Sequence, residues 1–418
     1  MAIQPKNYNM QPPCLRKFPY PYQAAFALAN DIDNTPSQFV FMEMMKLLNT
    51  TSETIFGKGF GLEISSSFWF FNATHSYQLS YFKNITREET GFASACRELW
   101  RSGHIDCLHT YGDFDEGRFG RKYAEMAIDE LTKHSAKIQT WINHGNCNNI
   151  QNLGIFDHCY GDQPDHPAYH FDLLTHQDLR YIWSGKMTHV LGQNSAKTLN
   201  VKMKVLLQKF LAASKYRALK NKPFYLENDL IQTIQLKDGH RIWDFQRFVN
   251  NWGREQVLDS KELGAQIQPS NIQRLISNEG FLIVYTHMCE GLSASDRLPE
   301  KLYQVFDFLA EKYFSGELLV STVSRLLKYS ELIKTMQWNY CRENERLFIK
   351  IDSKLNNLDD HDNLTESDLP GITFYCEEPS NVSVFLGDRE LPVQHNYQDH
   401  TGRHSVSIPW KKLDFPNF

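Results

Sequence analysis

Short apolar runs alternate with longer amphipathic stretches along most of the chain. Continuous apolar runs of roughly four to eight residues are typical of buried strands, whereas an apolar residue at every third or fourth position indicates a helix. The stretches predicted as strands are AAFALANDI (24–32), GLEISSSFWFF (61–71), HIDCLHTY (104–111), KIQTWINHG (137–145), RYIWSG (180–185), GFLIVYTHM (280–288) and ELLVSTVS (317–324). The stretches predicted as helices are PSQFVFMEMMKLLN (36–49), TREETGFASACRELWRSG (86–103), GRKYAEMAIDELTKHSA (120–136), PEKLYQVFDFLAEKYFS (299–315) and SELIKTMQW (330–338). This alternation is typical of βαβ units and predicts an α/β protein with a parallel sheet.

The number of these units favours a barrel. About seven or eight strand and helix pairs in roughly 340 residues suit a (β/α)7–8 barrel better than an open sheet. Between about residues 195 and 280 the rhythm is interrupted by a long helix at 201–220 and by a hairpin at 231–248. In that hairpin, Asp238 and Gly239 fit a two-residue type I′ turn. We therefore predict a barrel domain over residues 1–341 with an inserted helix and hairpin.

The periodicity changes after about residue 342. The remaining stretches are short and strand-like, namely RLFIKIDS, ITFYCEE, VSVFLGD, LPVQHN and HSVSIPW. Clusters of turn-forming residues separate them, which predicts a small β-sandwich domain over residues 342–418. Carbohydrate binding, covering of one barrel face and formation of a homodimer are alternative roles for this domain.

The composition narrows the range of partners. The 418 residues carry a formal net charge of -5 and include 41% hydrophobic and 13% aromatic residues. This chain lacks the basic excess that follows a phosphate backbone, so no nucleic acid partner is expected. The sequence shows no pattern of a charged segment followed by an apolar one, as in a signal peptide, and no apolar run long enough to cross a bilayer. We therefore expect no membrane span and a cytoplasmic location. Eight scattered cysteines without a CxxC pair predict reduced thiols.

Titratable side chains follow four of the predicted strands. In a parallel barrel the loops after the strands surround a common mouth, so residues at the strand ends are the candidates for chemistry. These residues are Asp31 and Asp33 after the first strand, His109 and Asp113 after the third, His144 after the fourth and His287 after FLIVYT. Their positions at four separate strand ends predict one shared site.

Asp31 and Asp33 lie two positions apart, so in extended backbone both carboxylates point to the same side. One of them could bind a cation while the other accepts a proton. The alternative is a helix N-cap or an Asx turn, because Asn34, Thr35 and Pro36 are of the kind that begin helices.

His109 and Asp113 lie four positions apart at a strand end. Imidazole and carboxylate are ligands for zinc and other divalent first-row metals, and a catalytic site needs three protein ligands and an open position. Asp31 or Asp33 would supply the third ligand. The alternative is a core histidine followed by a loop-capping aspartate. His144 and His287 suit proton transfer, with a structural role as the alternative for each.

The order of these motifs resembles that of the polysaccharide deacetylase family, the NodB-like or carbohydrate esterase family 4 enzymes. That family has a strand ending in TFDDG, a second strand like ATFF and the sequence GHEIGNHTYSH; the segments here are ALANDIDNT, SSSFWFF and GHIDCLHTYGD. Gly103, His104, His109, Thr110 and Tyr111 fall in register with the third motif. The resemblance implies a distorted (β/α) barrel over roughly residues 15 to 340. It also implies metal-dependent hydrolysis of an N- or O-acetyl group on a sugar.

The resemblance implies roles for individual residues as well. His109 matches the first histidine of the family's HTxxH metal motif, and Asp113 stands where the family has its second histidine. Asp31 is assigned as the general base and Asp33 as a metal ligand, with the reverse assignment as the alternative. His287 in VYTHM is similar to the family's late LxH motif, whose histidine is the general acid.

The chain departs from the family after the fourth strand, where INHGN replaces an arginine and proline motif. Asn143 and His144, together with Tyr111, are therefore expected to contact substrate. The metal implied is zinc or another divalent first-row metal. The substrates implied are acetylated sugars, nucleotide sugars or oligosaccharides, in the cytoplasmic biosynthesis of a surface polysaccharide.

Two other functions are compatible with the same residues. One is a metal-independent barrel glycosidase that uses carboxylates such as Asp31 and Asp113, which would have to lie about 5 to 10 Å apart. The other is a non-catalytic carbohydrate-binding protein derived from a deacetylase. The metal content of the purified protein distinguishes the deacetylase from both.

Overall fold

The computed structural model describes residues 11–74, 77–145, 148–195, 202–207, 228–249, 259–355 and 363–418. The chain divides into two compact units. The α/β unit contains Ala24–Ser330 and Lys412–Phe418, and the β-rich unit contains the described residues before Ala24 together with Glu331–Lys411. The β-rich unit thus includes residues from both ends of the predicted barrel domain, since β1 (Cys14–Leu15) pairs with β19 (Thr373–Tyr375).

A curled sheet of eleven strands forms the centre of the α/β unit. In spatial order the strands are β11 (Met187–Thr188), β14 (Arg247–Phe248), β15 (Phe281–Thr286), β2 (Ala24–Asn30), β5 (Ser66–Phe68), β7 (Ile105–Leu108), β9 (Thr140–Ile142), β10 (Tyr181–Trp183), β13 (Arg241–Phe245) and β12 (Ile231–Gln235), with β16 (Leu318–Val320) pairing with β2. The pairs in this sheet are parallel apart from the β12–β13 hairpin. β2 is buried along its whole length, which accounts for its unbroken apolar sequence. This arrangement is compatible with the barrel-like α/β fold that the alternating pattern predicts.

Two small ladders accompany the main sheet. They are β3 (Glu53–Thr54) with β4 (Gly57–Lys58), and β6 (Phe71–Asn72) with β8 (Gly112–Asp113).

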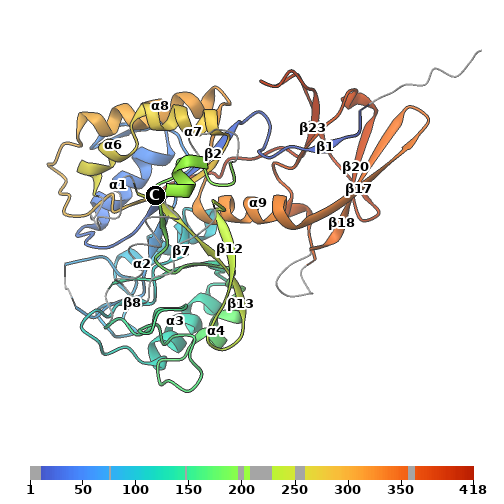
Figure 1. The fold of residues 1–418 in the computed structure, drawn as a ribbon. Coiled ribbons are helices and arrows are strands. Elements are labelled where there is room, and N and C mark those ends of the chain that lie inside the picture. The colour runs from blue at the N-terminus through green and yellow to red at the C-terminus, as the bar shows by residue number, and fades with distance from the viewer. Residues whose placement is uncertain are drawn as a thin grey trace, which may run out of the picture. The chain divides into compact units, whose positions relative to one another are not determined.

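Amphipathic helices lie around the strands of this unit (Figure 1). They are α1 (Gln38–Asn49), α2 (Phe92–Ser102), α3 (Arg121–Lys133), α4 (Phe171–Thr175), α6 (Ser260–Gln266), α7 (Pro269–Asn278), α8 (Glu300–Phe314) and α9 (Val323–Thr335), and residues 202–207 are helical as well. The first turn of α1 is capped by Ser37, whose side chain accepts a hydrogen bond from the Val40 N–H. Neither Asp31 nor Asp33 is therefore the N-cap of this helix.

The segment SELIKTMQW differs from its prediction. The pattern predicts one helix, but α9 ends at Thr335 and Met336 begins strand β17 (Met336–Glu343). From Trp338 onward β17 pairs with β18 (Arg346–Leu355), so the ladder with a neighbouring strand overrides the local helical pattern. The predicted strand ELLVSTVS is also shorter, because β16 ends at Val320 and α9 starts at Val323.

The predicted hairpin is present, but its turn differs. The Gly239 N–H donates to the carbonyl of Leu236 at 3.0 Å, and Gly239 has a φ of 93°. Asp238 is not among the residues with positive φ. A type I′ turn needs positive φ at both central residues, so this turn is longer and uses glycine only at its left-handed position.

The hairpin strands extend the main sheet. β13 pairs in parallel with β10, and Trp243 and Phe245 are buried within it. These two aromatic rings therefore serve packing. Trp252 and most of the helix predicted at 201–220 lie outside the described residues.

The β-rich unit contains two four-stranded sheets. One has the order β1-β19-β23-β22 and the other has the order β17-β18-β20-β21. The strands not yet given are β20 (Val382–Leu386), β21 (Arg389–Leu391), β22 (Gln394–Asn396) and β23 (Ser405–Ser407), with 3-10 turns η1 (Glu366–Asp368) and η2 (Pro379–Asn381). The rings of Trp338 on β17 and Phe374 on β19 meet edge to face with centroids 4.8 Å apart. Across both units, none of the described helices is both long and apolar enough to cross a membrane.

Candidate functional site

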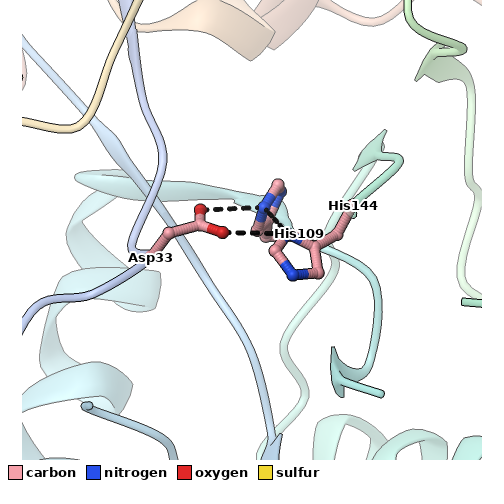
Figure 2. A group of neighbouring side chains, drawn as sticks. All are labelled: Asp33, His109 and His144. Carbon is pink, nitrogen blue, oxygen red and sulfur yellow. Dashed lines mark hydrogen bonds and ion pairs between the residues drawn. The ribbon is translucent and has the colours of Figure 1, made fainter. Parts of the chain in front are cut away.

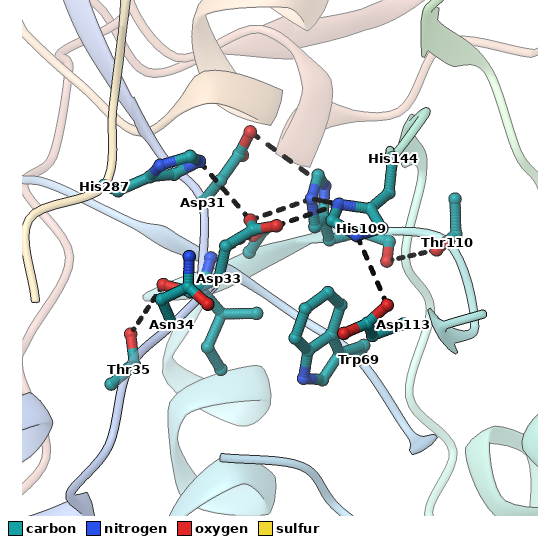
Figure 3. Close-up of polar contacts among 12 residues, drawn as sticks. Asp31, Asp33, Asn34, Thr35, Trp69, His109, Thr110, Asp113, His144 and His287 are labelled. Carbon is teal, nitrogen blue, oxygen red and sulfur yellow. Dashed lines mark hydrogen bonds and ion pairs between the residues drawn. The ribbon is translucent and has the colours of Figure 1, made fainter. Parts of the chain in front are cut away.

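The titratable residues singled out in the sequence follow the carboxyl ends of β2, β7, β9 and β15 (Figure 3). The sheet hydrogen bonds continue for one residue after the ends of β2 and β7. The Asp31 N–H donates to the Thr286 carbonyl at 2.8 Å, and the His109 N–H donates to the Phe68 carbonyl at 2.8 Å. These side chains are therefore held by rigid strand ends, as in other parallel α/β proteins.

Asp33 faces two histidines that follow different strands (Figure 2). Its Oδ2 lies 2.9 Å from Nε2 of His109, and its Oδ1 lies 2.8 Å from Nδ1 of His144. The two ring nitrogens are 2.9 Å apart. Asp33 and His109 are buried and His144 is partly buried, so three potential metal-ligand atoms face one another away from bulk solvent.

Hydrogen bonds alone account poorly for this arrangement. In the part of the chain that the structure describes, Nδ1 of His109 is buried without a hydrogen-bond partner, and Oδ2 of Asp33, although 2.9 Å from Nε2 of His109, is not aligned for a hydrogen bond. Such atoms are rare in native proteins and call for an explanation. Two imidazole nitrogens and a carboxylate oxygen are a donor set that zinc and related divalent metals bind, with a position left open. Asp33, His109 and His144 are accordingly a first group that could hold a metal, and Asp31, Asp33 and His287 also lie close enough together to do so.

Asp113 lies on the far side of the His144 ring. Its Oδ1 is 3.8 Å from Nε2 of His144, and Oδ1 of Asp115 is 3.7 Å from the same nitrogen. Asp113, Asp115 and His144 form a second group of possible ligands that shares only His144 with the first. Within the first group, His144 stands beside Asp33 and His109 where the sequence analysis assigned Asp113.

The carboxylate of Asp113 is held in its ionised form. Gln78 donates to its Oδ2 at 2.7 Å. Burial disfavours the charge, but interactions with His144 and Thr74 lower the pKa of Asp113 to about 2. Asp113 is therefore an acceptor that faces the outer nitrogen of His144.

Asp31 has a different partner, Arg247, which lies at the start of β14. The guanidinium donates to Oδ2 of Asp31 at 2.8 Å and to Oδ1 at 3.2 Å, and both side chains are almost fully buried. The guanidinium lies 4.1 Å from the ring centroid of Trp183 and 5.1 Å from that of Tyr285. Oδ2 of Asp31 is also 4.0 Å from Nδ1 of His109. Arg247 thus orients Asp31 toward the edge of the histidine group.

His287 also contacts Asp33 and lies next to Asp31 (Figure 3). Its Nε2 is 3.4 Å from Oδ2 of Asp33 and 3.0 Å from the hydroxyl of Tyr285, while its Nδ1 is 3.1 Å from Oε2 of Glu290. Burial disfavours the imidazolium, but the carboxylates of Asp33, Glu290 and Asp31 raise the pKa of His287. The ring is therefore set up to hold a proton at near-neutral pH.

Asp33 and His144 stabilise each other's charged forms. Burial opposes ionisation of Asp33, but His109, His144 and His287 hold the pKa of its carboxyl well below the ordinary value. Burial also opposes protonation of His144, but Asp33 and Asp113 help to raise the pKa of its imidazole well above the ordinary value. A cation is therefore strongly favoured between these groups, whether a proton or a metal ion.

The remaining predicted site residues make packing and loop contacts. Tyr111 is fully buried and its ring meets those of Trp141 and His170 edge to face. Asn143 accepts hydrogen bonds from the Trp141 indole N–H at 2.8 Å and from the Leu153 N–H at 3.0 Å, and donates to the Leu153 carbonyl at 2.7 Å. These contacts support the loop that carries the neighbouring histidine.

Three polar residues of the site were not identified from the sequence. They are Gln78, Arg247 and Glu290, which contact Asp113, Asp31 and His287 respectively, and Asp115 beside His144 is a fourth. Arg247 is the start of a short strand within the hairpin region, and Glu290 lies three positions after His287. Arg247 could have been identified as a cationic residue within a strand, and Glu290 as a carboxylate close in sequence to a histidine. Gln78 has no such signal.

Comparison of the chain with protein-family models, with curated proteins and with solved structures finds no match.

Proposed function

We propose that this protein is a divalent-metal-dependent hydrolase that removes an acetyl group from an N- or O-acetylated sugar. The observation that carries the proposal is the convergence of Asp33, His109 and His144, with Asp31 and His287 beside them. The proposal is supported by three potential ligands, a buried carboxylate and a histidine with a raised pKa, all at the ends of parallel strands. The motif resemblance of the segment 103–113 points to the same reaction.

Asp33, His109 and His144 would hold the metal, with zinc favoured by two imidazole ligands and one carboxylate. When bound, such a metal polarises a carbonyl and lowers the pKa of water. The ligand atoms would be Nε2 of His109 and Nδ1 of His144, because these nitrogens face the Asp33 carboxylate.

Asp31 would act as the general base. Its ion pair with Arg247 fixes the direction of the carboxylate. Asp33 is less suited to this role, because both of its oxygens face histidine nitrogens at 2.8 to 2.9 Å. The geometry therefore favours Asp31 as base and Asp33 as ligand over the reverse assignment.

His287 would act as the general acid that protonates the departing amine or alkoxide. The contact with Glu290 engages Nδ1, which leaves Nε2 to carry a proton toward the centre of the site. Its raised pKa keeps that proton available near neutral pH. A carboxylate oxygen of Asp31 and a ring nitrogen of His287 lie within 4.8 Å of each other, so the proposed base and acid are neighbours beside the ligand group.

The glycosidase alternative is less well supported by the same residues. A glycosidase needs one carboxylic acid that retains its proton near neutral pH. Asp113 has a pKa lowered to about 2, and Asp31 is paired with an arginine. Neither side chain is suited to deliver a proton.

The experiment that tests the proposal combines metal analysis with acetate release. Purified protein would be assayed for bound metal and for acetate released from acetylated oligosaccharides and nucleotide sugars. We expect about one metal per chain, loss of metal in His109→Ala, and retained metal with at least about 100-fold lower activity in Asp31→Asn, in line with general base catalysis.

His240→Ala is the matched control, because His240 also contacts a carboxylate, Asp238, but lies at the turn between β12 and β13. It should retain both metal and activity. Metal-free protein whose acetate release survives His109→Ala and Asp31→Asn would refute the proposal. Bound metal without acetate release would leave a binding protein as the better description.

A further inference from the structure

Gln78 joins the two sides of the candidate site. Its side chain is 9% exposed, and its Oε1 accepts a hydrogen bond from the Asn34 backbone N–H at 3.1 Å. Its Nε2 donates to Oδ2 of Asp113 at 2.7 Å and to Oδ1 of Asn72 at 3.3 Å. One acceptor and both amide hydrogens are thus engaged at the same time. A glutamine meets this requirement, whereas a glutamate or methionine of similar length does not.

Through Asp113, Gln78 influences the orientation of the His144 ring. Asp113, held by Gln78, faces Nε2 of His144 together with Asp115, at 3.8 and 3.7 Å. If Nδ1 binds a metal, a neutral imidazole carries its one proton on Nε2, and the two carboxylates stand on that side as acceptors. The lone pair on Nδ1 then points to Asp33, which is the orientation a metal ligand requires.

On the other side, Gln78 holds the backbone of Asn34. Asn34 has a φ of 51°, a left-handed conformation that asparagine tolerates better than most residues. Its side chain donates to Oε1 of Glu290 at 2.9 Å, and Oε2 of Glu290 faces Nδ1 of His287 at 3.1 Å. The chain of contacts from Gln78 through Asn34 and Glu290 therefore ends on His287.

We infer that Gln78 is a positioning residue for both His144 and His287, acting through the contacts just described. The inference rests on the proposed function, because that function assigns metal binding to His144 and proton donation to His287. A residue that only supported the loops would contribute to stability but would not alter metal geometry or proton donation.

Three variants separate the two sides. Gln78→Met removes both polar ends and affects both sides. Gln78→Glu keeps an acceptor for Asn34 but sets a carboxylate against Asp113, so it affects chiefly the His144 side. Asn34→Gly keeps the backbone N–H and the left-handed conformation but deletes the contact with Glu290, so it affects only the His287 side.

The first measurement is metal binding, made with Co(II) and Zn(II) alone in the full chain. We expect Gln78→Met and Gln78→Glu to bind either ion about 10 to 100 times more weakly than wild type, as is usual when a partner of a metal-binding histidine is lost. The visible absorption bands of the cobalt-loaded protein should shift in both variants. Asn34→Gly should bind cobalt with wild-type affinity and give the wild-type spectrum.

The second measurement is the dependence of acetate release on the leaving group, with a series of acetate esters whose alcohols differ in basicity. A misplaced general acid matters most for basic leaving groups. Gln78→Met and Asn34→Gly should both lose rate with the basic alcohols and retain it with the acidic ones.

Gln177→Met serves as the matched control, since Gln177 is also buried and donates to Thr132 on α3. It should leave metal affinity, spectrum and leaving-group dependence unchanged. If wild type binds neither ion, the proposed function and the inference both fail. If wild type binds cobalt and Gln78→Met matches it in affinity and spectrum, the inference alone is overturned. Equal leaving-group dependence in Gln78→Met and wild type would overturn it as well.

Discussion

Asp31 and Asp33 differ in role although they are only two positions apart. The period of an extended chain sends both carboxylates to one side, and both do reach the same site. The first pairs with Arg247, while the second faces the two histidines His109 and His144. The surroundings of each carboxylate, rather than its place in the sequence, therefore favour one as base and the other as ligand.

The pair of Asp31 and Arg247 leads to a prediction about stability. Arg247→Met should destabilise the protein by about 3 to 5 kcal/mol, because it leaves a buried carboxylate without its counter-charge. The double variant with Asp31→Asn removes both charges and should recover a large part of this loss. Urea unfolding of the wild type, both single variants and the double variant measures the difference. A double variant no more stable than Arg247→Met would contradict the prediction.

At the scale of elements, the bend after β7 determines which residues share the ligand group. Thr110 has a φ of 49°, which is unusual for a β-branched residue, and its N–H donates to the carbonyl of Ile142. Beyond this bend, Gly112 and Asp113 pair with β6 instead of continuing in the main sheet. His109 and Asp113 are therefore separated, and His144 from the end of the adjacent β9 stands beside His109 instead.

The turn between β12 and β13 leads to a prediction about local backbone conformation. Gly239→Ala should destabilise the protein by about 1 to 2 kcal/mol, because its φ of 93° disfavours a residue with a Cβ. Apart from its two chain neighbours, no described residue has a heavy atom within 4 Å of the position a Cβ would take, so steric contact does not account for the loss. Gly239→Asn should cost less, since asparagine tolerates positive φ. Equal losses for the two variants, measured by thermal unfolding, would argue against the conformational explanation.

At the scale of the whole molecule, buried neutral histidines make stability depend on pH. Burial lowers the pKa of His104 and of His170 to about 4 each. In the unfolded chain a histidine titrates near pH 6.5, so between these values the unfolded state binds protons that the folded state does not. The contribution of these two histidines to the free energy of unfolding is therefore complete above about pH 6.5 and is lost as the pH falls toward 4.

We expect each of these histidines to reduce the free energy of unfolding by about 1.4 kcal/mol per pH unit within that window. His104→Gln and His170→Gln should therefore each show a shallower loss of stability between pH 6.5 and 5 than wild type. The measurement is urea unfolding at several pH values, with exposed His176→Gln as control. The prediction fails if the buried-site variants have the same pH slope as the control.

The sequence predicts a large part of the α/β framework. Short, largely apolar runs correspond to β2, β7, β9, β10 and β15, and amphipathic runs correspond to α1, α2, α3 and α8. These elements are recognisable because burial of a strand or of one helix face imposes a pattern on neighbouring positions. The prediction was wrong at 336–338, where pairing with β18 makes a strand of residues that continue a helical pattern.

By itself, the sequence determined which residues end the parallel strands, and hence that Asp31, Asp33, His109, His144 and His287 lie near one edge of the sheet. Only the tertiary structure decided how they are partnered. Arg247 reaches Asp31 across 216 positions, and Gln78 reaches Asp113 across 35. The physical reason is that periodicity reports whether a side chain is buried, whereas hydrogen bonds and ion pairs depend on distances of a few ångströms between strands and loops. The bend at Thr110 is one such detail, and it separates Asp113 from His109.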